Sequence, residues 1–147
     1  MYTTSSLIKQ NDLTQRLTGK EIKEALTIWR GIPEKIGDFP QYIKNLYQKC
    51  KALKKGDVLY MPEYSFWSDD RKHALERAIV FSSSNSGILY EVTLPSGYNL
   101  YEEYHPILPR ASKFLCLGNR KIKSVKKGFE YNLIKLKLLP RDVNIKD

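Results

Sequence analysis

Cysteine is scarce in this 147-residue chain, which has two, Cys50 and Cys116. No second Cys or His lies at ligand spacing from either one, so we interpret both as small buried apolar side chains and expect no metal. This usage favours a reducing compartment over the disulfide framework of a small secreted domain. The two histidines, His73 and His105, do not form a His-x-x-x-His pair.

Long hydrophobic runs are also missing. No stretch approaches the roughly 18–20 apolar residues that span a bilayer. The first ten residues, MYTTSSLIKQ, have neither the basic nor the apolar region of a secretory signal. We therefore expect no membrane association and a cytoplasmic location, in the producing or a host cell, with secretion left open.

Several sequence motifs of well-known enzymes are absent as well. The chain has no Gly-x-Gly-x-x-Gly, no Walker phosphate loop and no nucleophile elbow around a serine. These absences argue against a Rossmann dehydrogenase, a P-loop NTPase and an α/β-hydrolase.

Positive charge, by contrast, is abundant. Twenty-five Lys and Arg face sixteen Asp and Glu, which gives a net charge of +9. Residues 110–127 contain seven basic side chains and no acid. Such a face suits an acidic partner, which could be a nucleic acid, an anionic protein surface or a phosphate-bearing ligand. The alternative is the solvated surface of a lysine-rich protein. One hypothesis is therefore a basic nucleic-acid-binding domain whose exposed aromatic residues stack on bases.

The length and the 41% hydrophobic content fit one globular domain, which we place at residues 18–147 after a flexible segment, 1–17. Thr18 and Glu21 have capping-box spacing ahead of a short helix, Asp38 is a candidate N-cap for a helix over 39–53, and Ser68 for one over 69–80. Strands are predicted at 26–30, 57–61, 87–95, 113–118, 121–125 and 132–140. Early helices followed by mostly antiparallel strands indicate an α+β fold.

Three short segments carry candidate chemistry. Arg30-Gly31 ends a predicted strand, where a guanidinium can reach a phosphate beside an unhindered backbone. Residues 64–68, Tyr-Ser-Phe-Trp-Ser, lead aromatic and hydroxyl groups into a helix. Residues 103–105, Glu-Tyr-His, precede a Pro-bracketed apolar run. Each of these residues has a structural alternative. Arg30 would be a surface arginine, Phe66 and Trp67 would be core aromatics, and Ser68 would be a helix cap. Glu102 and Glu103 would be turn carboxylates, and His73, in the following helix, a surface histidine.

In order and spacing, these segments resemble the ADP-ribosyltransferase family of the arginine–serine–glutamate type, which includes clostridial-type toxins, ectoenzymes and phage enzymes. The resemblance spans roughly residues 25–140. The matching segments are Trp29-Arg30-Gly31, Lys55-Gly56-Asp57, 64–68 with Ala74, 88–97, Glu103-Tyr104-His105 with Pro109 and Lys113-Phe114, and 133–139.

The resemblance implies two packed, mainly antiparallel β-sheets around an NAD cleft with flanking helices. It implies transfer of ADP-ribose from NAD to an acidic macromolecule, with a protein favoured over a nucleic acid, by a monomer that uses no metal. The implied roles are as follows: Arg30 binds the diphosphate or ribose, the Gly31 backbone meets the nicotinamide amide, Ser68 orients the catalytic loop, Ser65 joins the cofactor-binding set, and Trp67 or a neighbouring aromatic stacks on nicotinamide.

The chain departs from the family pattern at two places. Phe66-Trp67 replace the Ser-Thr of a Ser-Thr-Ser motif, and His105 replaces the second glutamate of Glu-x-Glu. That glutamate matters because cleavage of the nicotinamide–ribose bond builds positive charge on the sugar, which a neutral imidazole does not stabilise as a carboxylate does. Three hypotheses follow: Glu103 takes the catalytic role, His105 has a different role in the cleft, or the fold is kept for binding alone.

Overall fold

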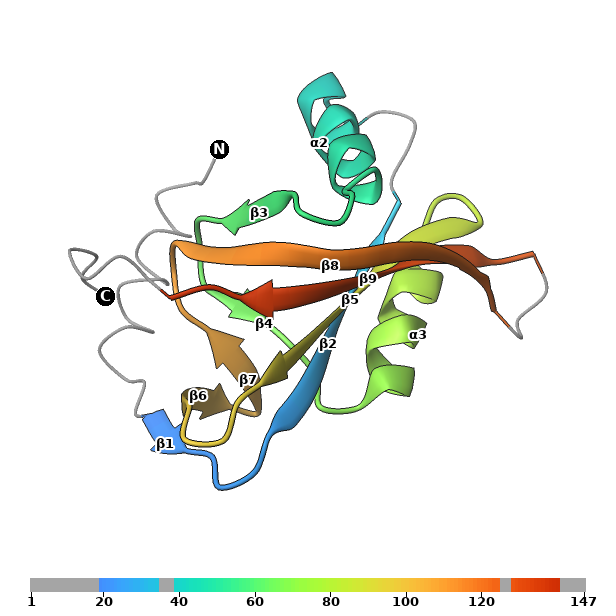
Figure 1. The fold of residues 1–147 in the computed structure, drawn as a ribbon. Coiled ribbons are helices and arrows are strands. Elements are labelled where there is room, and N and C mark those ends of the chain that lie inside the picture. The colour runs from blue at the N-terminus through green and yellow to red at the C-terminus, as the bar shows by residue number, and fades with distance from the viewer. Residues whose placement is uncertain (1–18, 35–38, 125–127, 141–147) are drawn as a thin grey trace.

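A computed structural model describes residues 19–34, 39–124 and 128–140. Two β-sheets pack face to face and two helices flank the larger sheet, one on its outer face and one near an edge, which confirms the α+β prediction (Figure 1). The elements in chain order are β1 (Gly19–Glu21), β2 (Leu26–Pro33), α2 (Gln41–Lys51), β3 (Val58–Met61), β4 (Ser65–Phe66), α3 (Arg71–Phe81), β5 (Ser86–Leu94), β6 (Asn99–Glu103), β7 (His105–Leu108), β8 (Ser112–Lys123) and β9 (Glu130–Leu138).

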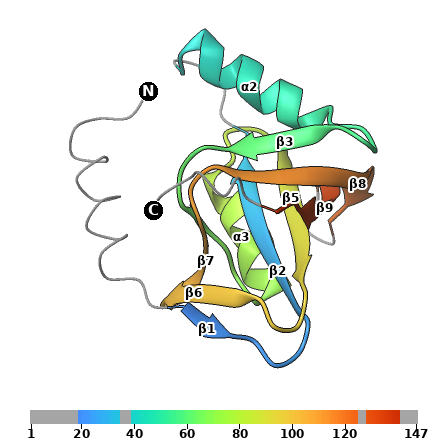
Figure 2. The same ribbon diagram turned by 60° about the vertical axis from the view of Figure 1, so that its left-hand side comes forward.

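The smaller sheet has the order β1-β6-β7-β4, and the larger has the order β2-β5-β9-β8-β3. All neighbouring strands are antiparallel except β5 and β9, which run parallel. Strand β2 lies at one edge of the larger sheet and β3 at the other. Helix α3 packs along β2 and β5, whereas α2 lies near β3 (Figure 2).

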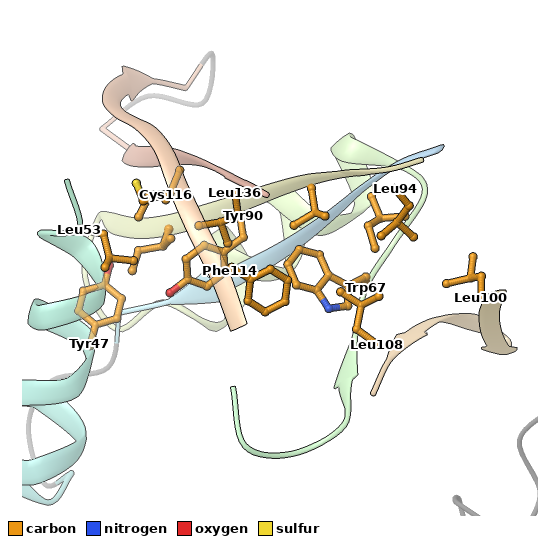
Figure 3. Close-up of a cluster of buried hydrophobic side chains, with 14 residues drawn as sticks. Tyr47, Leu53, Trp67, Tyr90, Leu94, Leu100, Leu108, Phe114, Cys116 and Leu136 are labelled. Carbon is orange, nitrogen blue, oxygen red and sulfur yellow. The ribbon is translucent and has the colours of Figure 1, made fainter. Parts of the chain in front are cut away.

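The main core fills the space between the two sheets. Alternation along β2 directs Ile28 and Ile32 into this space, where they meet apolar residues of β5, β8 and β9. Trp67 lies beside Phe114 and Leu108 in this core (Figure 3). The segment that carries Trp67 is therefore anchored to both sheets.

A second core lies under α3, on the outer face of the larger sheet. Ala74 and Ala78 are the buried residues of the helix, and they contact Leu89, Leu133 and neighbouring residues. Small side chains let the helix backbone approach β2 closely. The prediction that Ala74, Leu75, Ala78 and Ile79 face the core is confirmed, with the alanines deepest.

Several predicted boundaries are wrong for identifiable reasons. Residues 19–21 form a strand paired with β6, because a sheet partner outweighs a local capping signal; Thr18 lies outside the described residues. The segments predicted as 113–118 and 121–125 form one strand, β8, which absorbs the intervening residues with an irregular register between Cys116 and Gly118. Residues 1–17 and Asp38 also lie outside the described part of the chain. Helix α2 begins after Pro40, whose side chain forms no capping hydrogen bond.

Helix α3 begins two residues later than predicted, and its N-cap is Asp70. One carboxylate oxygen of Asp70 accepts hydrogen bonds from the backbone N–H of Lys72 and of His73, at 3.0 and 3.4 Å. We expect Asp70→Ala to lower the free energy of unfolding by about 1 kcal/mol, the usual cost of losing an N-cap. Urea denaturation measures this change, and Asp69→Ala, which removes an equal charge one residue earlier, is the control.

Candidate functional site

The segment 65–68 joins the two sheets. Its first residues form β4, which pairs with β7, and the Trp67 N–H donates to the Pro106 carbonyl oxygen at 2.9 Å. One residue later the chain pairs with β2: Ser68 and Trp29 each donate a backbone N–H to the carbonyl of the other at 2.8 Å. These bonds bring β7, on the smaller sheet, to the edge of the larger sheet at Arg30 and Gly31.

A cavity of about 290 Å³ lies at this junction. Five of the residues predicted from sequence line it: Arg30, Gly31, Trp67, Ser68 and His105. They come from β2, the 65–68 segment and β7. The cavity is completed by Trp29, Ile32, Pro33, Phe66, His73, Ala74 and Arg77.

Glu103 does not line this cavity, but it lies directly opposite His105 in the β6–β7 register. Residues opposite each other in an antiparallel pair project to the same face. The chain reverses through Tyr104, which adopts a positive φ of 65° and is 97% exposed. Glu103 is thus placed beside the cavity, on the face that His105 presents to it.

Two predicted cofactor-binding residues are instead largely buried. Ser65 is 1% exposed, and its hydroxyl oxygen accepts a hydrogen bond from Trp67 Nε1 at 2.7 Å. Trp67 is 2% exposed and packs at tilted angles on Tyr90 and Phe114. The Trp67 indole is therefore a core side chain with little surface for stacking on a ligand. The neighbouring aromatic Phe66 is 50% exposed and lines the cavity.

Ser68 shapes the turn between β4 and α3. Its hydroxyl accepts a hydrogen bond from the Asp70 N–H at 3.0 Å and lies 3.1 Å from the Asp70 carbonyl oxygen, to which it donates. It is therefore not the N-cap of α3, although it helps to place Asp70, which is. The predicted role of orienting a loop beside the cleft is consistent with these contacts.

Gly31 has a packing role in addition to any contact with a ligand. A Cβ atom at this position would collide with the backbone carbonyl oxygen of Ala74 in α3. The absence of a side chain at Gly31 therefore allows helix and strand to approach each other. The Arg-Gly pair that marks the site in the sequence is also a helix–sheet contact.

Sequence reasoning missed two residues of the cavity, His73 and Arg77. They stand one helical turn apart on α3 and face His105 across the cavity. The rings of His73 and His105 stack with centroids 6.0 Å apart and planes 17° from parallel. The sequence did show that His73 and Arg77 are four residues apart and so lie on one face of the helix. It did not show which residues of other elements lie opposite that face.

A second, larger cavity of about 440 Å³ lies on the other side of Arg30. It is mostly apolar and is bounded by α2, β3 and the inner face of β2 and β5. Arg30, Ile32 and Pro33 line both cavities, and Arg30 Nη1 lies 3.5 Å from Met61 Sδ in the larger one. Arg30 therefore marks the boundary between the two spaces.

Tyrosine hydroxyls near the larger cavity stay protonated well into the alkaline range. Burial raises the pKa of Tyr47 to about 12, partly offset by the Ser86 hydroxyl. Burial is also the main cause that raises the pKa of Tyr90, with Cys50 adding to it. Both cysteines are free, and Cys116 is buried, as predicted.

The basic segment predicted as a docking face lies away from the cavity. Its described basic residues on β8 are separated from β2 by β9 and β5. The exposed members on these two strands are Lys113, Arg120, Lys121 and Lys123 of β8 with Lys135 and Lys137 of β9. Residues 125–127 lie outside the described part of the chain.

Neither helix of the described residues has the length and hydrophobicity of a membrane span. Within the same residues, no three side chains among His, Cys, Asp and Glu are grouped as metal ligands.

No protein-family model matches the sequence, and no curated protein does. Solved structures do match. Plx2a, an ADP-ribosyltransferase toxin from Paenibacillus larvae, superposes with a TM-score of 0.55 and 17% identity over 82% of this chain and 64% of its own. C3stau2 from S. aureus, solved with NAD, superposes with a TM-score of 0.58 and 13% sequence identity, over 95% of this chain and 74% of its own. The enzymatic component C2-I of the C2 toxin from Clostridium botulinum superposes with a TM-score of 0.55 and 15% sequence identity, over 93% of this chain and 37% of its own.

The chain therefore has the fold of the ADP-ribosyltransferase toxins. It spans 64% of the length of Plx2a and 37% of that of C2-I. Two mainly antiparallel sheets with flanking helices, expected from the family resemblance, are confirmed.

Proposed function

We propose that the protein transfers ADP-ribose from NAD to an acidic macromolecular acceptor and releases nicotinamide. The observation that carries the proposal is the convergence of Arg30, Gly31, Ser68 and His105 around one cavity, in the fold of ADP-ribosyltransferase toxins. These residues come from three segments that are distant in the sequence.

A dinucleotide fits the arrangement of the two cavities on either side of Arg30. The guanidinium at their boundary suits the diphosphate, because Arg offers paired donors to phosphate oxygens. The nicotinamide riboside half would occupy the smaller cavity, against Gly31. The adenosine half would occupy the larger, mostly apolar cavity.

In this proposal, Glu103 supplies the negative charge that the reaction needs. Departure of nicotinamide leaves a cationic sugar, and a fixed carboxylate lowers the energy of that state. Glu103 stands beside His105 on the same strand face, so a small shift of its side chain brings the carboxylate to the cavity rim. His105 would hydrogen-bond a ribose hydroxyl.

A second candidate function is an NAD-binding module without turnover. It is favoured by the composition of the smaller cavity, which no Asp or Glu lines among the described residues. The two functions predict different behaviour on incubation with NAD, since only the enzyme releases nicotinamide.

The test is Glu103→Gln, measured by nicotinamide release and by thermal stabilisation with NAD. We expect release to fall on the order of a hundredfold or more while stabilisation by NAD persists, because the lost charge acts mainly in the transition state. Glu102→Gln is the matched control, since alternation directs this exposed residue to the opposite face of β6. Equal release by both variants would remove Glu103 from the mechanism, and stabilisation without release by the unaltered protein would establish the binding module.

A further inference from the structure

One side of the smaller cavity is formed by α3 and β7. His73 and Arg77 project from α3 on successive turns, and His105 faces them from β7 at the 6.0 Å ring separation. All three side chains are exposed, so this side of the cavity is accessible to a macromolecule. Arg77 also lines a shallow neighbouring cavity with Gly31, Pro33 and Phe81.

The charges on this side are of one sign. Among the described residues, Arg77 has no ion pair or hydrogen bond, and no carboxylate lines the cavity. A guanidinium with no partner in the described part of the chain and two imidazoles, one on each wall, form an anion-binding arrangement.

From this charge arrangement we infer that the acceptor is itself an anionic nucleophile, the phosphate monoester at the end of a nucleic acid strand, held by Arg77, His73 and His105. The inference rests on the proposed transfer of ADP-ribose.

The reaction balances without a base. A phosphate monoester has a second pKa near 6, so at pH 7 it is largely a dianion with no proton to lose. One of its oxygens forms a bond to C1 of the nicotinamide-bearing ribose, the bond from that carbon to the ring nitrogen breaks, and its electron pair goes to the ring. Nicotinamide leaves as a neutral molecule, and the strand end becomes a phosphate diester.

A strand end suits the site better than a phosphorylated side chain of a protein. Phe66, half-exposed in the same cavity, offers a ring on which the terminal base can stack. The remaining phosphates of a strand would meet the chain's net charge of +9, whereas a single phosphorylated side chain would not.

The test uses labelled NAD with one oligonucleotide in three forms: 5′-phosphorylated, 3′-phosphorylated and with hydroxyls at both ends. A phosphoserine peptide forms the fourth arm. We expect label on one or both phosphorylated strands, resistance of the labelled end to phosphatase, and none on the hydroxyl-ended strand. Equal labelling of the hydroxyl-ended strand overturns the inference, as does preferential labelling of the peptide, although both leave ADP-ribosyl transfer standing.

Variants on α3 test the residues themselves. Arg77→Ala is expected to raise KM for the phosphorylated oligonucleotide about tenfold, the loss typical of one charge-assisted hydrogen bond, and to leave KM for NAD within about twofold. Lys72→Ala removes the same charge from an exposed position of α3 that does not line the cavity, and it should change neither. A parallel rise in KM for NAD would assign Arg77 to the NAD site and overturn the inference.

Binding is measured separately by fluorescence anisotropy, which needs no turnover. The 5′-phosphorylated strand should bind more tightly than the hydroxyl-ended one, and Arg77→Ala should abolish the difference. If no nicotinamide is released in any arm, the proposed transfer fails. If the two strands bind equally, the phosphate site fails whatever happens to NAD.

Discussion

Arg30→Ala is expected to weaken NAD binding by roughly ten- to a hundredfold and to reduce nicotinamide release to background. A hydrogen bond to a charged group contributes about 1.5–3 kcal/mol, and the guanidinium stands at the boundary of both cavities, where the diphosphate would lie. Arg30→Lys should restore little of this loss, because a lysine ammonium does not offer the paired geometry of the guanidinium. Calorimetry with NAD measures the first effect and nicotinamide release the second.

The control for Arg30 is Arg120→Ala on β8. Arg120 is exposed and lies across the larger sheet from the cavity, so this variant loses the same charge far from the site. Both variants should keep the circular dichroism spectrum of the unaltered protein. NAD affinity unchanged in Arg30→Ala would contradict the nucleotide hypothesis. Oligonucleotide binding that survives Arg30→Ala would be assigned to cationic groups other than Arg30, either Arg77 or the basic residues of β8 and β9.

Gly31→Ala is expected to cause a large loss of stability, with the free energy of unfolding lower by roughly 1–3 kcal/mol or more. The added methyl group would meet the Ala74 carbonyl oxygen, which belongs to helix backbone and cannot rotate away as a side chain can. This collision is removed only if α3 moves away from the sheet, which would also displace His73 and Arg77. Urea denaturation gives the stability change.

Gly118→Ala is the matched control, because a Cβ at Gly118 would have no atom within 4 Å. Its effect on the free energy of unfolding should lie within about 0.5 kcal/mol, as for ordinary surface substitutions. Equal stability of the two variants would show that α3 adapts to a larger residue at position 31. The role of Gly31 would then be confined to the ligand.

The sequence indicates the elements of this fold better than their ends. The apolar run in residues 87–95 and the alternation of apolar residues with lysine over 133–138 predict strands close to those observed. The first strand, β5, is buried on both faces and therefore shows no alternation. The strand at residues 19–21 was missed because its stability comes from a partner eighty residues away, and a local helix signal competes with it.

The sequence motifs Arg-Gly and Tyr-Ser-Phe-Trp-Ser identify segments that line the site, but they do not predict which of their side chains point into the cavity. Phe66, at the end of β4, is half-exposed in the cavity, whereas Trp67, the next residue, is buried in the core and only borders the cavity. Which of the two aromatic residues is buried is fixed by pairing of this segment with β7 and β2, which the sequence does not reveal. His73 gave no signal of its own, since its significance depends on His105 on another element.

The paired backbone bonds between Trp29 and Ser68 fasten the two sheets to each other at the floor of the cavity. Separation of the two sheets at this point would break both backbone hydrogen bonds at once. The segment 65–68 therefore ties the position of His105 on β7 to that of Arg30 and Gly31 on β2, and a substitution that weakens either strand pairing would displace one wall of the cavity relative to the other.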